Sequence, residues 1–300
     1  MQLHKAKREQ VKLKLGISGP SGTGKTYSSL ILASGLTDDY SKIAIIDTEN
    51  GSANLYSHLG EFNVLTLKAP FSPEAYIKAI EICENAKMEV IIIDSLTHEW
   101  SGSGGCLEIH EQLGGRFQDW APVTKRHQAF IDKIINCNAH IITTVRSKVD
   151  YSMDVGSNGR TKVVKQGLKP ITREGLDYEM TVFFELINDN HLAKAGKDRT
   201  RLFMGKPEFV INKSTGLKLL NWCNNNSDLV KIKQEISQCQ TLEGLRHVYS
   251  KYPNQKQSIY DSILKRKAEL EQSSDLIIPN EEIINQQTNI ENGSTTKTAE

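Results

Sequence analysis

Short apolar runs alternate with longer amphipathic segments along the first 225 residues of the chain. The apolar runs are rich in β-branched residues and predict strands at 11–18, 42–48, 62–68, 89–94 and 139–145. The intervening segments have helical spacing and predict helices at 25–36, 73–87 and 122–137. Because strands without polar alternation are typical of sheets covered on both faces, this pattern predicts an α/β fold with a mainly parallel central sheet.

The pattern changes after Val145. Residues 147–175 are polar, basic and glycine-containing, and because they have no hydrophobic period we expect a long mobile loop there. Two apolar runs, 179–187 and 199–205, then flank the basic turn AKAGKDR. These runs predict a β-hairpin that ends the sheet.

The last quarter of the chain differs in composition from the rest. NNNSD at 224–228 is typical of a linker, and the spacing of apolar residues in 228–270 predicts two or three short amphipathic helices. The remaining residues are rich in Asn, Gln, Ser, Thr and Glu, which predicts disorder. We therefore expect a core at 1–225, a helical module at 226–270 and a polar, acidic tail at 271–300.

The overall composition, with 38% hydrophobic and 24% charged residues, is ordinary for a globular protein. No apolar run reaches the roughly 18 residues of a membrane-spanning helix, and the basic N-terminal segment lacks the apolar stretch of a signal peptide. Five widely spaced cysteines without a C-x-x-C pair favour reduced thiols. We therefore expect a cytoplasmic protein without a membrane partner.

The segment GPSGTGKT has all the parts of a phosphate-binding loop and lies between a predicted strand and a predicted helix. Its glycines let backbone N–H groups turn towards phosphates, Lys25 can reach the β- and γ-phosphates, and the Thr26 hydroxyl can bind Mg²⁺. The N-terminus of the helix also faces the anion. We therefore predict that ATP and Mg²⁺ are bound here by Gly19, Pro20, Ser21, Gly22, Thr23, Gly24, Lys25, Thr26 and Tyr27.

Acidic residues follow two of the predicted strands. EVIIID ends in Asp94, which we expect to hold Mg²⁺ through water beside the hydroxyl of Thr26. IAIIDTE places Glu49 at the same edge of the sheet. Hydrolysis needs a carboxylate that orients or deprotonates the attacking water, and Ser95 occupies the usual position for it directly after Asp94. The carboxylate must therefore come from elsewhere, and the candidates are Glu49 and Glu99.

The phosphate loop, IDTE and IIID resemble the motifs of RecA/DnaB-like ATPases over roughly residues 10–225. This resemblance implies a RecA-like P-loop NTPase core with a terminal β-hairpin, followed by a small C-terminal helical segment. In that family a glutamate two residues after the aspartate of the second strand activates the water, which implies that Glu49 is the catalytic base and Glu99 the alternative. AHIITTVRSK is similar to the strand with the γ-phosphate sensor, which implies that role for Thr144 or Arg146.

HLAKAGKDRTRLF resembles the DnaB-type hairpin that carries K-x-R. The cations of that hairpin reach the γ-phosphate of a neighbouring subunit and stabilise charge in the transition state. The resemblance implies that Lys197 and Arg199 act in this way in a homo-oligomer, either a ring or a filament. The alternative is a solvated basic turn, since charge clusters are common on turns.

The chain looks most like compact phage ATPases with a RecA core, including those of the Sak type that are implicated in single-strand annealing and recombination. This resemblance implies single-stranded DNA as a partner, together with a single-strand-binding protein or another replication or recombination protein. Outside the acidic last thirty residues the chain is mildly basic, which is compatible with DNA binding. Cations for phosphates and aromatic rings for bases are present after Asp94 (Trp100, Arg116) and after Arg146, where we expect contacts from Lys148, Tyr151, Arg160, Lys162 and Lys165.

Two other functions are open at this point. A helicase-like motor or loader is disfavoured because only about ten residues precede the first predicted strand, where DnaB-type helicases usually carry a further domain. An ATP-controlled switch or scaffold would instead recruit partners through the C-terminal helices. A zinc site at His98, Cys106 and His110 is not expected, because their spacing matches no usual zinc pattern.

Overall fold

The computed structural model describes residues 11–155, 161–187, 190–224, 227–253 and 256–274. The chain divides into two compact units, Met1–Asn224 and Asn225–Glu300. The described part of the second unit consists of three helices around a small apolar core: α8 (Ser227–Gln238), α9 (Leu242–Lys251) and α10 (Lys256–Ser274). The predicted tail beyond Ser274 lies outside the described residues.

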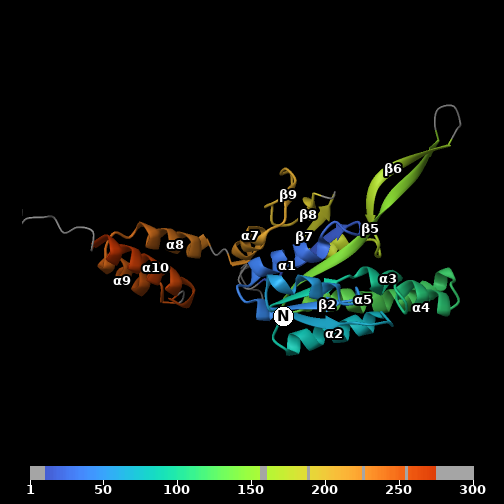
Figure 1. Ribbon diagram of the computed structural model, residues 1–300, viewed down its shortest axis with the longest axis horizontal. Coiled ribbons are helices and arrows are strands. Elements are labelled where there is room, and N and C mark those ends of the chain that lie inside the picture. The colour runs from blue at the N-terminus through green and yellow to red at the C-terminus, as the bar shows by residue number, and fades with distance from the viewer. Residues whose placement is uncertain (1–10, 156–160, 188–189, 225–226, 254–255, 275–300) are drawn as a thin grey trace, which may run out of the picture. The chain divides into compact units, whose positions relative to one another are not determined.

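Nine strands of the described chain are joined by hydrogen bonds; eight of them form the sheet at the centre of the first unit, and the ninth, β6 (Thr161–Pro170), pairs only with β5 (Figure 1). Six of them are parallel, and across the sheet they follow the order β3 (Asn63–Thr66), β2 (Ile43–Asp47), β4 (Val90–Asp94), β5 (His140–Val155), β1 (Lys14–Gly19) and β7 (Val182–Leu186). Antiparallel β8 (Leu192–Asp198) and β9 (Phe209–Val210) extend the sheet beyond β7. The mixed α/β fold with a mostly parallel sheet is therefore as predicted.

The five strands predicted from apolar runs are confirmed as β1 to β5, with β1, β2 and β4 buried along their whole length. The three predicted helices are confirmed as α1 (Lys25–Leu36), α2 (Pro73–Asn85) and α5 (Trp120–Asn136). Ser72 caps α2, since its side chain accepts a hydrogen bond from the backbone N–H of Ala75. Local patterning and capping therefore agree with the final fold here.

Helices cover both faces of the sheet (Figure 1). Helices α1 and α7 (Lys213–Asn224) pack on one face and α2 and α5 on the other, each with its own apolar core. The contact between α1 and α7 is close, because a Cβ atom on Gly35 would lie 2.2 Å from the backbone oxygen of Lys213. The shorter helices are α3 (Thr97–Ser101), α4 (Cys106–Gln112), α6 (Leu176–Glu179), η1 (Tyr40–Lys42), η2 (Ser52–Leu59) and η3 (Phe117–Asp119).

The prediction of a mobile loop over 147–175 is wrong. Strand β5 continues past the sheet to Val155, and its outer half pairs antiparallel with β6 (Thr161–Pro170). This ribbon extends away from the sheet (Figure 1), and no helix layer packs along it within the described chain. The stretch VDYSMDV at 149–155 alternates apolar and polar residues with the period of two that is typical of a strand, and the prediction overlooked this signal among the basic and glycine-containing residues around it.

The terminal hairpin is present, but the prediction placed its second strand wrongly. AKAGKDR is not the turn; it forms most of β8, which pairs with β7. The buried positions of β8 are Ala193 and Ala195, whose small side chains give a weak apolar signal. Residues after β8 form a turn around Asp198, whose carboxylate accepts hydrogen bonds from the backbone N–H groups of Thr200 and Phe203.

Candidate active site

The phosphate loop and both acidic strand ends meet at one edge of the sheet. Parallel β1, β2 and β4 end there together and β5 crosses the same edge at Arg146, with Asp47 opposite Asp94 and Gly19 opposite Arg146. A cavity of about 510 Å³ opens at this edge. It is lined by Ser21, Gly22, Gly24, Lys25, Thr26, Tyr27, Glu49, Ser52, Tyr56, Asp94, Arg146 and His191.

The phosphate loop has the backbone geometry that its glycines predict. Gly22 and Gly24 have φ values of 84° and 85°, in the left-handed region that side chains rarely allow. The loop is closed by the Thr23 hydroxyl, which donates to the backbone oxygen of Pro20, and Lys25 Nζ donates to the same oxygen at 2.7 Å. Burial lowers the pKa of Lys25. A phosphate anion in the cavity would offset that desolvation, since it favours the charged ammonium.

Asp94 lies at the bottom of the cavity between two hydroxyl groups. Thr26 Oγ1 donates to one carboxylate oxygen at 2.6 Å, and Thr144 Oγ1 donates to the other. Asp94 is 2% exposed, and burial raises its pKa. Thr26 and Asp94 together supply the oxygen ligands that Mg²⁺ prefers, so the residues predicted for the metal fit that ion. Thr144 acts as a support for Asp94 and does not line the cavity.

Glu49 lies at the cavity wall and is held by two partners. Arg146 forms an ion pair with both carboxylate oxygens, and Ser95 Oγ donates to Oε1 at 3.1 Å. The side chains of Glu49 and Arg146 are 21% and 40% exposed, so both can meet a ligand. Asp47 is fully buried and accepts hydrogen bonds from the backbone N–H groups of Glu49 and Ala53. Asp47 therefore shapes the turn that presents Glu49.

The alternative base, Glu99, does not reach the cavity. Its carboxylate is fully buried and bonds to His127 and Cys106. Glu99 follows Asp94 by five residues, but it lies on α3, which turns this side chain away from the sheet edge. Nearby Trp100 also does not act as a free stacking surface, since its ring stacks on Trp120 with centroids 5.7 Å apart.

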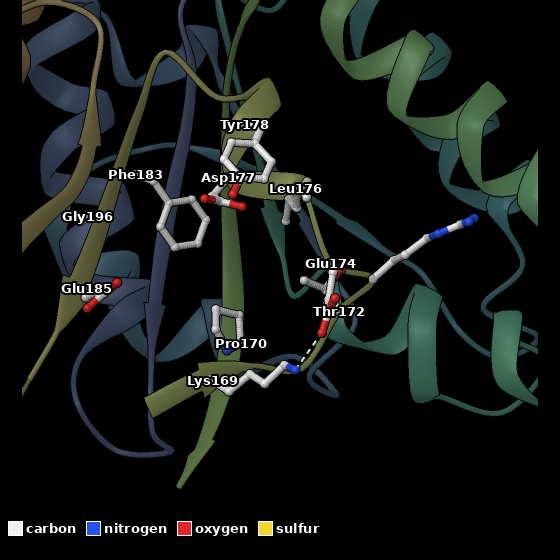
Figure 2. Close-up of a pocket in the computed structure, with 12 residues that line it drawn as sticks. Lys169, Pro170, Thr172, Glu174, Leu176, Asp177, Tyr178, Phe183, Glu185 and Gly196 are labelled. Carbon is white, nitrogen blue, oxygen red and sulfur yellow. Dashed lines mark hydrogen bonds and ion pairs between the residues drawn. The ribbon is translucent and has the colours of Figure 1, made fainter. Parts of the chain in front are cut away.

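Lys197 and Arg199 lie on a different part of the chain from the phosphate cavity. Lys197 Nζ donates to the backbone oxygens of Asp177 and Tyr178, and Arg199 Nη2 donates to Tyr178 at 2.6 Å. Beside them is a second cavity of about 360 Å³, walled by Tyr178, Phe183 and Glu185 among others (Figure 2). Neither cation lines the phosphate cavity of its own chain. A role at a neighbouring subunit stays a prediction.

The predicted DNA contacts fall on the β5–β6 ribbon. Lys148 is exposed on β5 and lies opposite Lys169 of β6. The backbone places Tyr151 opposite Lys165, and Lys162 opposite Asp154. The side chains of Tyr151, Lys162 and Lys165, and the whole of Arg160, lie outside the described part of the chain. In the other predicted segment, Arg116 forms an ion pair with Asp119 at 3.0 Å.

Three lining residues have no sequence signal that identifies them. His191 lies in the turn between β7 and β8, and its Nδ1 atom lies 2.8 Å from the backbone oxygen of Thr23. It reaches the phosphate loop because β7 pairs with β1. Ser52 and Tyr56 come from η2, after IDTE, and the ring of Tyr56 lies 6.0 Å from that of Tyr27.

Comparison with known families agrees with this site. The family model described as AAA domain matches residues 11–210, which cover the sheet and every residue of the phosphate cavity. The chain belongs to this family, and so to the AAA-type P-loop ATPases. A search of curated proteins finds no match to the chain. No described helix combines the length and the apolar composition needed to cross a bilayer.

Proposed function

We propose that the chain hydrolyses ATP and works as an oligomer on single-stranded DNA in recombination, annealing or replication. The observation that carries hydrolysis is the position of Glu49, which lines the same cavity as Lys25 and Thr26. A carboxylate facing the phosphates can accept the proton of an attacking water, whereas a binding site alone needs no base there.

The other residues of the cavity divide the remaining tasks. Lys25 and the loop N–H groups bind the phosphates and stabilise the charge that develops during transfer. Thr26 and Asp94 would hold Mg²⁺, which neutralises charge on the phosphate oxygens. Arg146 holds Glu49 in place, and its exposed guanidinium can also bind a γ-phosphate. Tyr27 and Tyr56 offer aromatic surface for the nucleobase.

Single-stranded DNA binding rests on the β5–β6 ribbon and on the resemblance to phage ATPases of the RecA/DnaB and Sak types. The ribbon begins at Arg146, which is directly bonded to Glu49. A ligand that moves the ribbon would therefore act on the catalytic base through one side chain. This connection gives DNA a physical route to change the rate of hydrolysis.

Oligomer formation rests on Lys197 and Arg199. Both cations donate hydrogen bonds to backbone oxygens, and the carboxylates of Asp177 and Glu179 act on Lys197 only through space. In an oligomer they would complete the phosphate cavity of a neighbouring copy. A protein without this arrangement would have the same rate of ATP turnover per subunit at all protein concentrations.

ATP turnover with and without single-stranded DNA tests the proposed partner. We expect stimulation by DNA in the wild type, and at least a ~10-fold higher DNA requirement in a Lys148→Glu/Lys162→Glu double variant because phosphate contacts are lost. Lys78→Glu, an exposed charge reversal on α2, is the matched control. Turnover that ignores DNA would contradict the DNA role and favour a switch, and strand unwinding without annealing would favour a motor.

A further inference from the structure

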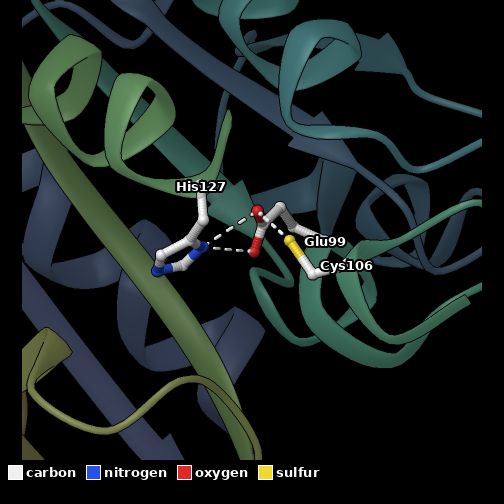
Figure 3. A group of neighbouring side chains, drawn as sticks. All are labelled: Glu99, Cys106 and His127. Atoms are coloured by element: carbon white, nitrogen blue, oxygen red, sulfur yellow. Dashed lines mark hydrogen bonds and ion pairs between the residues drawn. The ribbon is translucent and has the colours of Figure 1, made fainter. Parts of the chain in front are cut away.

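A second group of polar side chains is buried in the helical layer, apart from the phosphate cavity. Glu99 of α3, Cys106 of α4 and His127 of α5 converge there from three different helices (Figure 3). Glu99 and Cys106 are 0% exposed and His127 is 6% exposed. Such groups are rarely buried without a strong reason, because each loses its hydration.

The contacts within this cluster are short. His127 Nδ1 lies 3.0 and 3.1 Å from the two Glu99 oxygens, and Cys106 Sγ donates to Glu99 Oε1 at 3.1 Å. The cysteine and the histidine both bond to the carboxylate between them. Cys106 is therefore not arranged as a nucleophile activated by histidine, and burial raises the pKa of its thiol well above the ordinary value.

The same geometry suits a metal ion. One oxygen, one nitrogen and one sulfur atom lie within 4.8 Å of one another. For atoms so spaced, the point equidistant from all three lies at most about 2.5 Å from each, close to the ~2.0–2.3 Å bonds of zinc to these elements. A cation at this point would need only small shifts of the three side chains.

Charge also favours a divalent cation at this position. A carboxylate, a thiolate and a neutral imidazole carry two negative charges, which a divalent cation balances. Sulfur and imidazole ligands select zinc-type ions over Mg²⁺ or Ca²⁺, which prefer oxygen. Trp100 packs its ring against His127 at 5.8 Å and helps to close the cluster from solvent.

We propose that Glu99, Cys106 and His127 bind one zinc-type divalent cation that joins α3, α4 and α5. Its fourth ligand would be water, since the described residues offer three ligand side chains in this group. The ion would stabilise the glycine-containing stretch 102–105, which joins α3 to α4. This role is structural and independent of ATP hydrolysis.

Metal content of the purified full-length chain tests the proposal. After saturation with Zn²⁺ and gel filtration, we expect about one equivalent in the wild type. Cys106→Ser and His127→Gln should weaken Zn²⁺ binding by at least ~10-fold, because each removes a ligand. Cys137→Ser changes another buried, free cysteine outside the cluster and should bind like the wild type.

Cobalt supplies a readout that does not depend on the variants folding. Co²⁺ added to the wild type and to Cys137→Ser should produce a thiolate-to-cobalt charge-transfer band that saturates at about one equivalent. Absence of this band, or of stoichiometric Zn²⁺ in the wild type, would overturn the proposal and leave a hydrogen-bonded cluster. Metal binding that survives both ligand substitutions would overturn it as well.

Discussion

Glu49 and Glu99 have similar positions relative to the sheet, but their side chains lie in different environments. Each follows the carboxyl end of a strand, β2 or β4, and these strands are neighbours in the sheet. Glu49 turns to the phosphate cavity and pairs with a partly exposed arginine. Glu99 turns into the helical layer, where His127 and Cys106 surround it.

The difference shows that a position at the sheet edge does not by itself make an acid catalytic. A general base must meet the substrate and its water, and only Glu49 lines a cavity that could hold them. A fully enclosed carboxylate can instead hold structural elements together. Substitutions in the two surroundings should therefore affect different properties, turnover in one and folding or metal binding in the other.

The largest effect is expected at Lys25. Lys25→Ala removes the cation that stabilises charge on the transferred phosphate, and we expect turnover to fall by about 10³-fold. The midpoint of thermal unfolding without nucleotide should hardly change, because Lys25 bonds only to its own loop in the contacts described. Steady-state phosphate release and calorimetry measure the two quantities. Normal turnover in this variant would show that the cavity is not the ATPase site.

A large loss of stability is expected when the buried contact between Glu99 and His127 is removed. His127→Leu leaves the Glu99 carboxylate buried without its histidine, and we expect the free energy of unfolding to fall by about 3–5 kcal/mol. Urea unfolding measures this change. A variant as stable as the wild type would mean that Cys106 alone is a sufficient partner for Glu99, which would contradict the structural role given to the Glu99–His127 contact.

The apolar runs and the phosphate loop could be predicted because their signals are local. Strands such as β4 are continuous apolar segments, and a glycine-rich loop with a lysine between a strand and a helix is typical of phosphate binding. The Glu49–Arg146 pair joins residues 97 positions apart, and Glu99 and His127 are 28 positions apart. The pattern of a single sequence does not predict such contacts, because they form only when distant segments pack together. The β5–β6 ribbon could have been predicted in part, since VDYSMDV at 149–155 alternates apolar and polar residues, but the basic, glycine-containing composition around it favoured a loop.

A buried histidine at the start of β5, His140, is expected to make the stability of the protein depend on acid pH. His140 Nδ1 accepts the backbone N–H of Leu13 at 3.1 Å, and burial lowers its pKa from 6.5 to about 4. Its contribution is therefore present above pH 6.5 and is lost as the pH falls from 6.5 towards 4. His140→Asn keeps an acceptor that does not titrate, so this variant should lose about 3 kcal/mol less over that interval.

Urea unfolding near both ends of this interval measures the difference. An unchanged acid response in His140→Asn would show that other groups dominate acid unfolding.

The smallest effect is expected from Ser95. Ser95→Ala removes one hydrogen bond to Glu49 but leaves the ion pair with Arg146. We expect turnover to fall by about 3- to 10-fold, which corresponds to one ordinary hydrogen bond. Phosphate-release assays at saturating ATP measure it. A loss as large as that of Lys25→Ala would mean that the serine has a direct part in the chemistry.

The most direct test of the central claim compares hydrolysis of bound ATP by Glu49→Gln and Glu99→Gln in single-turnover experiments. The account predicts that Glu49→Gln still binds ATP but hydrolyses it at least ~100-fold more slowly. Glu99→Gln, measured at a temperature where it is folded, should remain within about 3-fold of the wild type because its side chain does not reach the cavity. Normal hydrolysis by Glu49→Gln, or a selective loss in Glu99→Gln, would contradict the account.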